Sequence, residues 1–316
     1  MYNKVLEQIE KHQTIIIHRH SKPDGDALGS QLGLKEAILA SYPTHSVYAV
    51  GDMTARYSFM GEMDVISDEV YKGALVFIVD CPETEMISDN RYKLADYIIK
   101  IDHHILKEEY GNMEFISTSH ESCCRYVFEI IEAMGLKLTN EGAKALYTGM
   151  VTDSGRFRYS STTSETFISA AKILKYDFNI CDVYNSLYLD ELDMCVLRAK
   201  YVLKMKLTKQ GNVAYIITTK EELNATGADI FTISRGMVNT MSGIRGIDIW
   251  ANFTETENGK VLVEIRSSKA NVNQVAVKYG GGGHLNASGA TIDSLSMIYN
   301  VLSDLDLVAR GVDINV

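Results

Sequence analysis

The chain has 316 residues, 46% of them hydrophobic and 23% charged, and its formal net charge is −10. This composition excludes a disordered chain, a collagen-like chain and a disulfide scaffold, and the length suggests two domains. The acidic balance also excludes a surface built for long duplex nucleic acid, which needs a broad basic stripe. A local basic site for a small anion, or a metal site, stays compatible with it.

The sequence shows no segment that would place the chain in a membrane. Its longest apolar runs, such as residues 74–79, fall far short of the roughly 20 residues that a spanning helix needs. Residues 1–13 lack the apolar core of a signal peptide. The five cysteines form no C-x-x-C or Cys/His ligand spacing, which indicates reduced thiols. We therefore expect a cytoplasmic protein.

The first half alternates strand-like and helix-like segments. Strands are predicted at residues 14–18, 47–50, 75–80 and 97–101, and helices at residues 28–41, 121–134 and 140–151. This alternation predicts an α/β domain with a doubly wound, mainly parallel sheet and helices on both faces. In such a sheet, ligands bind outside the carboxyl ends of the strands.

The second half has a different texture. Residues 182–203 have helical periodicity without Gly or Pro, which predicts a connecting helix. Beyond it, a smaller α+β domain is indicated by strands at 213–218, 247–253 and 261–266, a glycine-rich stretch at 280–283 and a final helix at 294–305. We expect a catalytic domain at 1–183, a helical linker at 184–208 and a substrate-binding domain at 209–316.

Acidic and histidine side chains stand where the apolar segments of the first half end. They are His20, Asp24 and Asp26 after the first strand, Asp80 after the third, Asp102, His103 and His104 after the fourth, and Asp153 at the end of a helix. Because the carboxyl ends of parallel strands meet at one edge of a sheet, we expect these groups to converge. Taken singly, Asp24 is equally compatible with a turn cap, and for Asp80 alone a plain strand end is favoured.

Five carboxylates cannot gather in a desolvated cleft without compensation, because like charges raise one another's pKa values. Divalent cations provide that compensation, and mixed Asp and His ligands suit Mn²⁺ better than a calcium site or a thiolate zinc site. Two cations that share a carboxylate could hold a hydroxide for in-line attack on phosphorus. We predict two divalent metal ions, Mn²⁺ first, with Mg²⁺ or Co²⁺ as alternatives.

His18 offers a competing motif, since His18-x-His20 is similar to the start of a metallo-β-lactamase-type loop. The rest of that loop is missing, because Lys22 and Pro23 follow. We therefore favour a packed core residue for His18, with ligation as the alternative.

Two sets of motifs together resemble a known family. The run from His20 through Asp24 and Asp26, then Asp80, the Asp102-His103-His104 triplet and Asp153, resembles the DHH phosphoesterase superfamily. Arg266-Ser-Ser-Lys-Ala-Asn271, followed by Gly280-Gly-Gly-Gly-His284, resembles the DHHA1 domain. In this order, over nearly the whole chain, the motifs resemble the nanoRNase and pAp-phosphatase branch. The Gly-Gly-Gly-His loop disfavours a family II pyrophosphatase, which carries a basic pattern there.

The resemblance implies roles for individual residues. His20, Asp24 and Asp80 would hold one metal, and Asp26, Asp80, His103 and Asp153 the other, with Asp80 as the bridge. His104 would contact the scissile phosphate or the leaving oxygen, and Asp102 would orient a neighbouring histidine. The substrate-binding residues would be Arg266, Ser267, Asn271, Gly281, Gly282, Gly283 and His284, with the active site between the two domains. Arg125 could reach substrate, but we favour a helix-surface position for it.

The function expected from these residues and from the resemblance is hydrolysis of very short oligoribonucleotides, roughly two to five nucleotides long, to mononucleotides, and of pAp to AMP. The partners would be short RNA or nucleotide bisphosphates, with no long duplex and no membrane, and the sequence leaves a homodimer open. One alternative is a signalling-dinucleotide phosphodiesterase acting on pApA, pGpG or cyclic di-AMP. A further alternative is a non-catalytic nucleotide-binding module.

Overall fold

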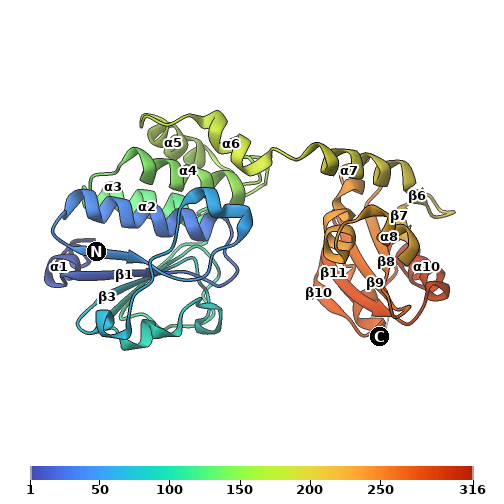
Figure 1. Cartoon of the computed structure of the whole chain (residues 1–316), viewed down its shortest axis with the longest axis horizontal. Helices are drawn as coiled ribbons and strands as arrows, with labels where there is room; N and C mark the ends of the chain where they lie inside the picture. Colours follow the sequence, from blue (N-terminus) through green and yellow to red (C-terminus); the bar gives the residue numbers. More distant parts are fainter. Residues whose placement is uncertain (1, 315–316) are drawn as a thin grey trace. The chain divides into compact units, whose positions relative to one another are not determined.

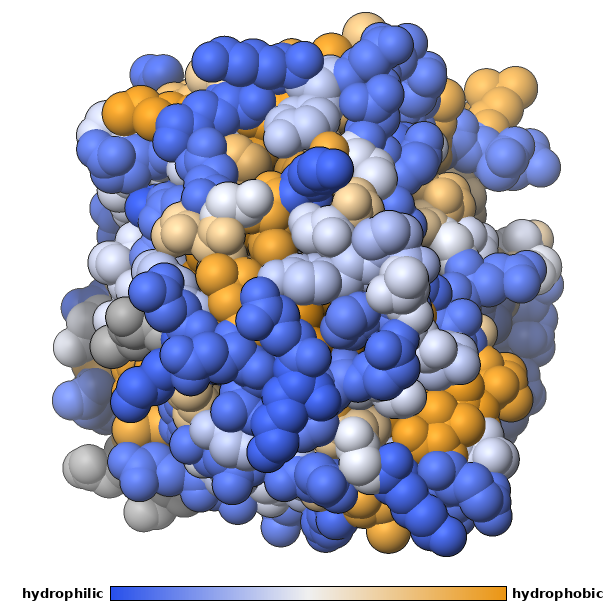
Figure 2. Space-filling view, turned by 90° about the vertical axis from the view of Figure 1, so that its left-hand side faces the viewer, coloured by the Kyte–Doolittle hydropathy of each residue, from blue (hydrophilic) through white to orange (hydrophobic). Residues whose placement is uncertain are grey.

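The computed structural model describes residues 2–314, and the chain divides into two compact units between Leu189 and Asp190. Each unit has its own sheet (Figure 1). Each unit also has its own apolar core. Among the described residues, no helix combines the length and the apolar character that a membrane span requires. The face shown in Figure 2 is mostly hydrophilic, with small separate apolar patches. The domain limits expected at residues 183 and 208 stay predictions.

Unit 1 is built on a five-stranded parallel sheet in the order β2-β1-β3-β4-β5. The strands are β1 (Thr14–His18), β2 (Ser46–Ala49), β3 (Leu75–Val79), β4 (Tyr97–Asp102) and β5 (Met113–Ile116). Every residue of β3 is buried, because a central parallel strand is covered on both faces. In this doubly wound order the direction of winding reverses between β1 and β3, which is where such folds bind ligands.

The two faces of this sheet are covered differently. One face carries α1 (Tyr2–Lys11), α2 (Gly25–Ser41), α3 (Cys123–Met134) and α4 (Asn140–Asp153), with α5 (Ser164–Ile173) and α6 (Ile180–Tyr188) further along (Figure 1). The other face is covered by short 3₁₀ turns, among them η2 (Asp68–Tyr71) and η4 (Asn90–Leu94). The parallel sheet is as predicted, but α-helices lie on one face only, since the connections from β2 to β3 and from β3 to β4 form short 3₁₀ turns instead.

Helices α2 and α4 pack closely through glycines of α2. Gly25, Gly29 and Gly33 form one stripe of α2, and a Cβ at Gly29 would lie 2.5 Å from the carbonyl oxygen of Ala145 in α4. A Cβ at Gly149 of α4 would lie 2.2 Å from a cysteine sulfur of α3. Helices α2 and α4 therefore approach to backbone contact at these glycines, with the side chain of Cys124 from α3 beside them, which brings the start of α2 to the end of α4.

Unit 2 has a six-stranded mixed sheet in the order β10-β11-β9-β8-β7-β6. The strands are β6 (Lys206–Leu207), β7 (Val213–Thr218), β8 (Ile249–Glu255), β9 (Val261–Ser267), β10 (Gly282–His284) and β11 (Ala287–Ile292). One face is covered by α7 (Leu192–Lys204), α8 (Lys220–Thr226), the π-helical turn η5 (Thr232–Gly236) and η6 (Val238–Met241), the other by α9 (Asn273–Lys278) and α10 (Ile298–Ala309). The expected α+β class is confirmed.

The single connecting helix predicted over residues 182–203 is wrong. Helix α6 ends at Tyr188 and α7 begins at Leu192, with extended backbone at Leu189. The break follows from the acidic residues at this point, because carboxylates stabilise a new helix N-terminus rather than a helix interior. Asp193 lies in the first turn of α7, and Asp190 pairs with the side chain of Arg198, eight residues further on.

Candidate active site

Asp80 lies between two histidines at the carboxyl edge of the parallel sheet. It directly follows β3, with a left-handed φ of +53°. Its main-chain N–H donates to the carbonyl of Ile101 in β4, at 3.0 Å. Asp80 Oδ2 is 3.5 Å from His20 Nε2, and Asp80 Oδ1 is 3.5 Å from His103 Nε2. A non-glycine residue in this backbone region is typical of functional sites, where the surrounding structure holds it.

Asp26 and Asp153 close the other side of the same site. The carboxylate of Asp26, in the first turn of α2, accepts hydrogen bonds from the main-chain N–H groups of Cys123 (2.6 Å) and Cys124 (2.8 Å) at the start of α3. His103 Nε2 is 3.6 Å from an oxygen of Asp26 and 3.6 Å from an oxygen of Asp153. Asp153 is the last residue of α4, so the glycine contacts between α2 and α4 place both carboxylates here.

The six residues predicted to hold metal therefore lie together. Among the described residues, three groups could each hold an ion: His20, Asp24 and Asp80; Asp26, His103 and Asp153; and Asp80, His103 and His104. Asp80 belongs to two of them, as a bridging ligand would. Asp24 also caps helix α2, accepting from the N–H groups of Asp26 and Ala27, so the turn-cap and ligand interpretations of Asp24 are compatible.

The donor atoms fit divalent cations. His20 Nδ1 lies 2.8 Å from the carbonyl oxygen of Ser21, and His103 Nδ1 lies 3.2 Å from that of His120. Because a carbonyl only accepts, each Nδ1 carries a proton, and Nε2 is the nitrogen that faces the carboxylates and would present its lone pair to a cation. Asp80 Oδ1 is buried and has no hydrogen-bond partner among residues 2–314. The 3.5–3.6 Å gaps around His103 Nε2 are close to the separation of about 3 Å between two ligands on one cation.

Without a cation, the carboxylates and imidazoles of the site share protons. Burial, with Asp80 and Asp153 nearby, raises the pKa of Asp26, and burial raises the pKa of Asp153 to about 6. Burial opposes protonation of His20 and His103, but the surrounding carboxylates outweigh it and raise the pKa of each to about 9. A cation at this site would displace those protons, as metal binding to imidazole ligands does.

His104 stands beside the ligand groups and is held by Asp102. Its Nδ1 is 2.8 Å from Asp102 Oδ1, and its main-chain N–H donates to the same oxygen at 3.2 Å. Asp102 is fully buried, and its hydrogen bond raises the pKa of the half-exposed His104. With Nδ1 engaged by a carboxylate, Nε2 is the atom left to meet a ligand.

The structure shows the surroundings of His18 and Arg125, for each of which the sequence allowed two interpretations. His18 is buried on the opposite face of the sheet, with its Nε2 3.1 Å from the hydroxyl of Tyr71, so the core interpretation is confirmed. The helix-surface position favoured for Arg125 is wrong. Arg125 is buried and pairs with Glu121 at 3.0 Å and with Glu129 at 2.9 Å, because partners four residues away on either side enclose it.

Sequence reasoning missed the residues that fix the His20 loop. The buried guanidinium of Arg19 donates to the carbonyl of His20 at 2.8 Å and to Asp52 at 3.0 Å. Asp52 also accepts from the main-chain N–H of Lys22, at 3.0 Å. A fully buried arginine at the end of β1 thus ties down both ends of the turn that carries His20. In the sequence, Arg19 is recognisable only as a charged residue next to His20, which does not predict its burial.

In unit 2, most of the predicted substrate-binding residues line one pocket. Arg266, Gly281, Gly282, Gly283 and His284 line a hollow of about 700 Å³. Two of the glycines are required there, because a Cβ at Gly281 would lie 2.1 Å from the carbonyl oxygen of Gly289, and one at Gly283 would lie 2.5 Å from that of Ala287. The backbone of β10 therefore lies directly on β11 and exposes its main chain to the pocket.

Ser267 and Asn271 do not line this pocket. The hydroxyl of Ser267 donates to the carbonyl of Ala270 and accepts from Asn286 at 2.9 Å, so it braces the loop after β9. The side chain of Asn271 accepts from the main-chain N–H of Asn273. Both residues thus shape the segment next to the pocket rather than its surface.

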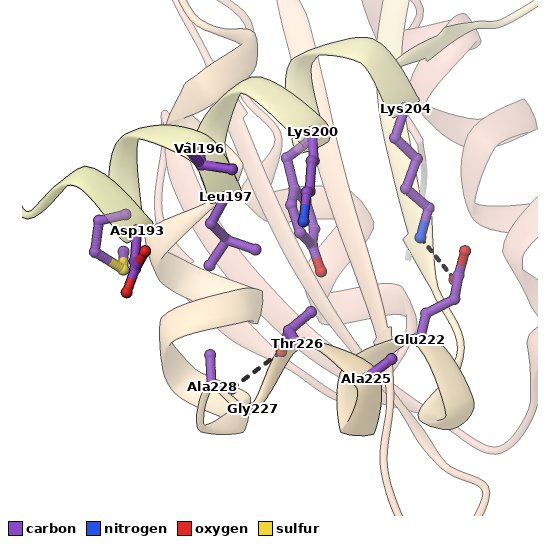
Figure 3. Close-up of a pocket in the computed structure, with 12 residues that line it drawn as sticks. Asp193, Val196, Leu197, Lys200, Lys204, Glu222, Ala225, Thr226, Gly227 and Ala228 are labelled. Carbon is purple, nitrogen blue, oxygen red and sulfur yellow. Dashed lines mark hydrogen bonds and ion pairs between the residues drawn. The ribbon is translucent and has the colours of Figure 1, made fainter.

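A second hollow in unit 2, of about 620 Å³, lies between α7 and α8 (Figure 3). Leu197 and Lys200 reach into it from α7, and an ion pair of 2.6 Å between Lys204 and Glu222 closes one end. None of the predicted site residues lines it.

Comparison with known proteins assigns both units. Residues 14–150 match the model of the DHH family, N-terminal domain, and residues 210–311 match the DHHA1 domain. The chain belongs to the DHH family of phosphoesterases, as its motifs predict, and is therefore a hydrolase.

Particular relatives cover almost the whole chain. It is 36% identical to the probable bifunctional oligoribonuclease and PAP phosphatase NrnA of Streptococcus mutans, over 96% of this chain and 97% of that protein. It is 34% identical to the bifunctional oligoribonuclease and PAP phosphatase NrnA of Bacillus subtilis, over 98% and 99%. The crystal structure of an exopolyphosphatase-related protein from Bacteroides fragilis shares the fold, with a TM-score of 0.81 at 24% identity over 98% and 97% of the two chains.

Proposed function

We propose that this chain is a metal-dependent phosphoesterase that hydrolyses very short oligoribonucleotides to mononucleotides and converts pAp to AMP. The observation that carries the proposal is the placing of Asp80 between His20 and His103, in a chain whose other unit presents a glycine-lined, arginine-containing pocket. The names of the relatives from Streptococcus mutans and Bacillus subtilis support the same substrates.

The proposed ligand sets follow the two groups that contain most of the carboxylates. His20, Asp24 and Asp80 would hold one cation, and Asp26, His103 and Asp153, with Asp80 shared, would hold the other. We propose Mn²⁺, because a mixed carboxylate and imidazole set suits it. Two such ions would activate water and neutralise charge at the reacting phosphate.

His104 is proposed as the chain's own catalytic residue. Its Nδ1–H is held by Asp102, so Nε2 can present a proton to a phosphate oxygen or to the leaving oxygen. The hydrogen bond to Asp102 raises the pKa of His104, which favours the protonated ring that a proton donor needs. Asp102 is then a positioning residue, since it fixes the ring and stabilises its protonated form.

The glycine-lined pocket is proposed to hold the terminal phosphate of the substrate. Its glycines allow main-chain N–H groups to approach phosphate oxygens, and Arg266 adds an always-charged planar fork. His284 lies at the same wall and can donate to the same anion. Such an anchor would favour substrates that carry a terminal phosphate, as pAp does.

A substrate panel tests this function. Purified protein with Mn²⁺ would be given a two-nucleotide and a five-nucleotide RNA, a twenty-nucleotide RNA, pAp, pApA, pGpG, cyclic di-AMP and pyrophosphate. We expect fast hydrolysis of the short RNAs and of pAp. Turnover of a single dinucleotide only would move the assignment to signalling-nucleotide breakdown. No turnover of any phosphoester would leave a binding module and end the enzyme proposal.

A further inference from the structure

One wall of the glycine-lined pocket is aromatic and cationic. It is made by Phe231 and Arg235, at the start and within the π-helical turn η5. Phe231 is 61% exposed, and the guanidinium carbon of Arg235 lies 5.8 Å from the centre of its ring. A flat ligand that entered this hollow could stack on the open face of the ring.

The turn η5, which carries Arg235, is held in place by hydrogen bonds from a buried side chain of the sheet. The fully buried side chain of Asn252, in β8, donates to the carbonyls of Ile233 (2.7 Å) and Ser234 (2.8 Å). These two bonds satisfy main-chain oxygens within the π-helical turn, an irregularity that is frequent at functional sites. Ser234 also lines the pocket, and its buried hydroxyl has no partner in the described part of the chain.

The carboxylate of Glu264 connects the two arginines of the pocket, Arg235 and Arg266. It is only 9% exposed, and it accepts from Arg235 Nε at 3.0 Å and from Arg266 Nη2 at 3.1 Å. Glu264 of β9 is paired in register with Asn252 of β8 on one side and with Gly289 of β11 on the other. A single buried carboxylate therefore fixes two guanidinium groups on one face of the sheet.

We propose that this pocket binds a whole terminal nucleotide, with its phosphate at the glycines and Arg266 and its base stacked on Phe231 beside Arg235. The inference rests on the proposed function and extends it, because it adds a base-binding subsite to the phosphate anchor. The hollow of about 700 Å³ is within the range of small-ligand sites. Stacking on a ring accepts every base, so Phe231 would favour nucleotides without selecting among them.

The test is a binding measurement that needs no turnover. Calorimetry on the full-length protein in EDTA would compare AMP, which has a base, with ribose 5-phosphate, which lacks one. We expect Phe231→Ala to weaken AMP binding roughly 5- to 150-fold and to leave ribose 5-phosphate binding unchanged. Phe231→Trp should retain AMP affinity, and Arg266→Ala should weaken both ligands.

Each outcome bears on a different claim. Equal affinity of wild type and Phe231→Ala for AMP, or equal losses for AMP and ribose 5-phosphate, would overturn the base-binding subsite. Because Phe231 is mostly exposed, its replacement tests binding without disturbing the core. Base-dependent AMP binding in a protein that hydrolyses no phosphoester would uphold this inference and reject the proposed function.

Discussion

The carboxylate of Asp26 is bound by the main-chain N–H groups of Cys123 and Cys124, which begin a helix 97 residues further along the chain. The same carboxylate faces His103 Nε2 at 3.6 Å. A helix N-terminus stabilises a negative charge, so α3 holds Asp26 in place while leaving it available to a cation. The geometry of the proposed metal site therefore depends on helix packing as well as on strand ends.

Asp80→Asn is expected to remove cation binding, because Asp80 belongs to two of the three groups that could hold an ion. Equilibrium dialysis with Mn²⁺ would measure the loss, and activity should fall by more than the roughly 100-fold that a change in an outer partner of a metal site costs. Asp68→Asn is the control, since Asp68 is exposed, pairs with Arg91 and belongs to none of those three groups. Unchanged Mn²⁺ binding in Asp80→Asn would show that the bridging assignment is wrong.

Gly29→Ala is expected to destabilise unit 1. Its new Cβ would lie 2.5 Å from the carbonyl oxygen of Ala145 and 2.7 Å from the sulfur of Cys124, and overpacking of this kind costs about 1–3 kcal/mol. Chemical denaturation would measure the change. Gly236→Ala is the control, because a Cβ there meets nothing within 4 Å. Equal unfolding free energies for the two variants would mean that α2 and α4 are not closely packed.

The ends of the parallel strands could be predicted from sequence, because an apolar run stops abruptly at Asp80 and again at Asp102. The left-handed turn at Asp80 and the cap on Asp26 could not, since both depend on contacts between distant segments. The burial of Arg125 could not be predicted for the same reason. Thr166, from α5, donates to Glu121, the partner of Arg125, and shields this ion pair from solvent.

The pocket of unit 2 was predicted in part. The residue types of the glycines and Arg266 predict the proposed phosphate site, because close backbone approach needs glycine. Phe231 and Arg235 carry no such signal, since they belong to no motif and only the fold sets them opposite the glycine loop. The break between α6 and α7 escaped prediction because it contains neither Gly nor Pro.

Glu129→Gln is expected to lower stability in a pH-dependent way. Burial opposes ionisation of Glu129, but hydrogen bonds from His120 and Arg125 lower its pKa to about 2. Because the folded pKa lies below the unfolded value of about 4.5, ionised Glu129 stabilises the fold above pH 4.5, and this contribution is lost as the pH falls toward 2. Its partial exposure limits the effect to about 1–2 kcal/mol.

Denaturation of wild type and Glu129→Gln at neutral pH and at about pH 3 would measure that difference. We expect the gap in unfolding free energy to shrink at the lower pH. Glu132→Gln, which breaks only the partly exposed pair with Lys172, serves as the control. A gap that stays constant across the range would contradict the assignment.

Arg266→Ala is expected to raise the KM for a short RNA roughly tenfold to a hundredfold, because a charge-assisted hydrogen bond to phosphate is lost. The Mn²⁺ content should not change, since Arg266 belongs to unit 2 and to none of the ion-holding groups. Arg310→Ala is the control, because Arg310 is exposed and lies outside the pocket. A KM equal to that of wild type would remove Arg266 from the phosphate anchor.

The most direct test of the account is the dependence of cleavage rate on RNA length. Single-turnover rates with Mn²⁺ would be measured for RNAs of two, three, five, ten and twenty nucleotides, with wild type beside Asp80→Asn. The account predicts rapid cleavage of the shortest RNAs, a steep fall with length, and no cleavage by Asp80→Asn. Equal rates on short and long RNA, or undiminished cleavage by Asp80→Asn, would contradict it.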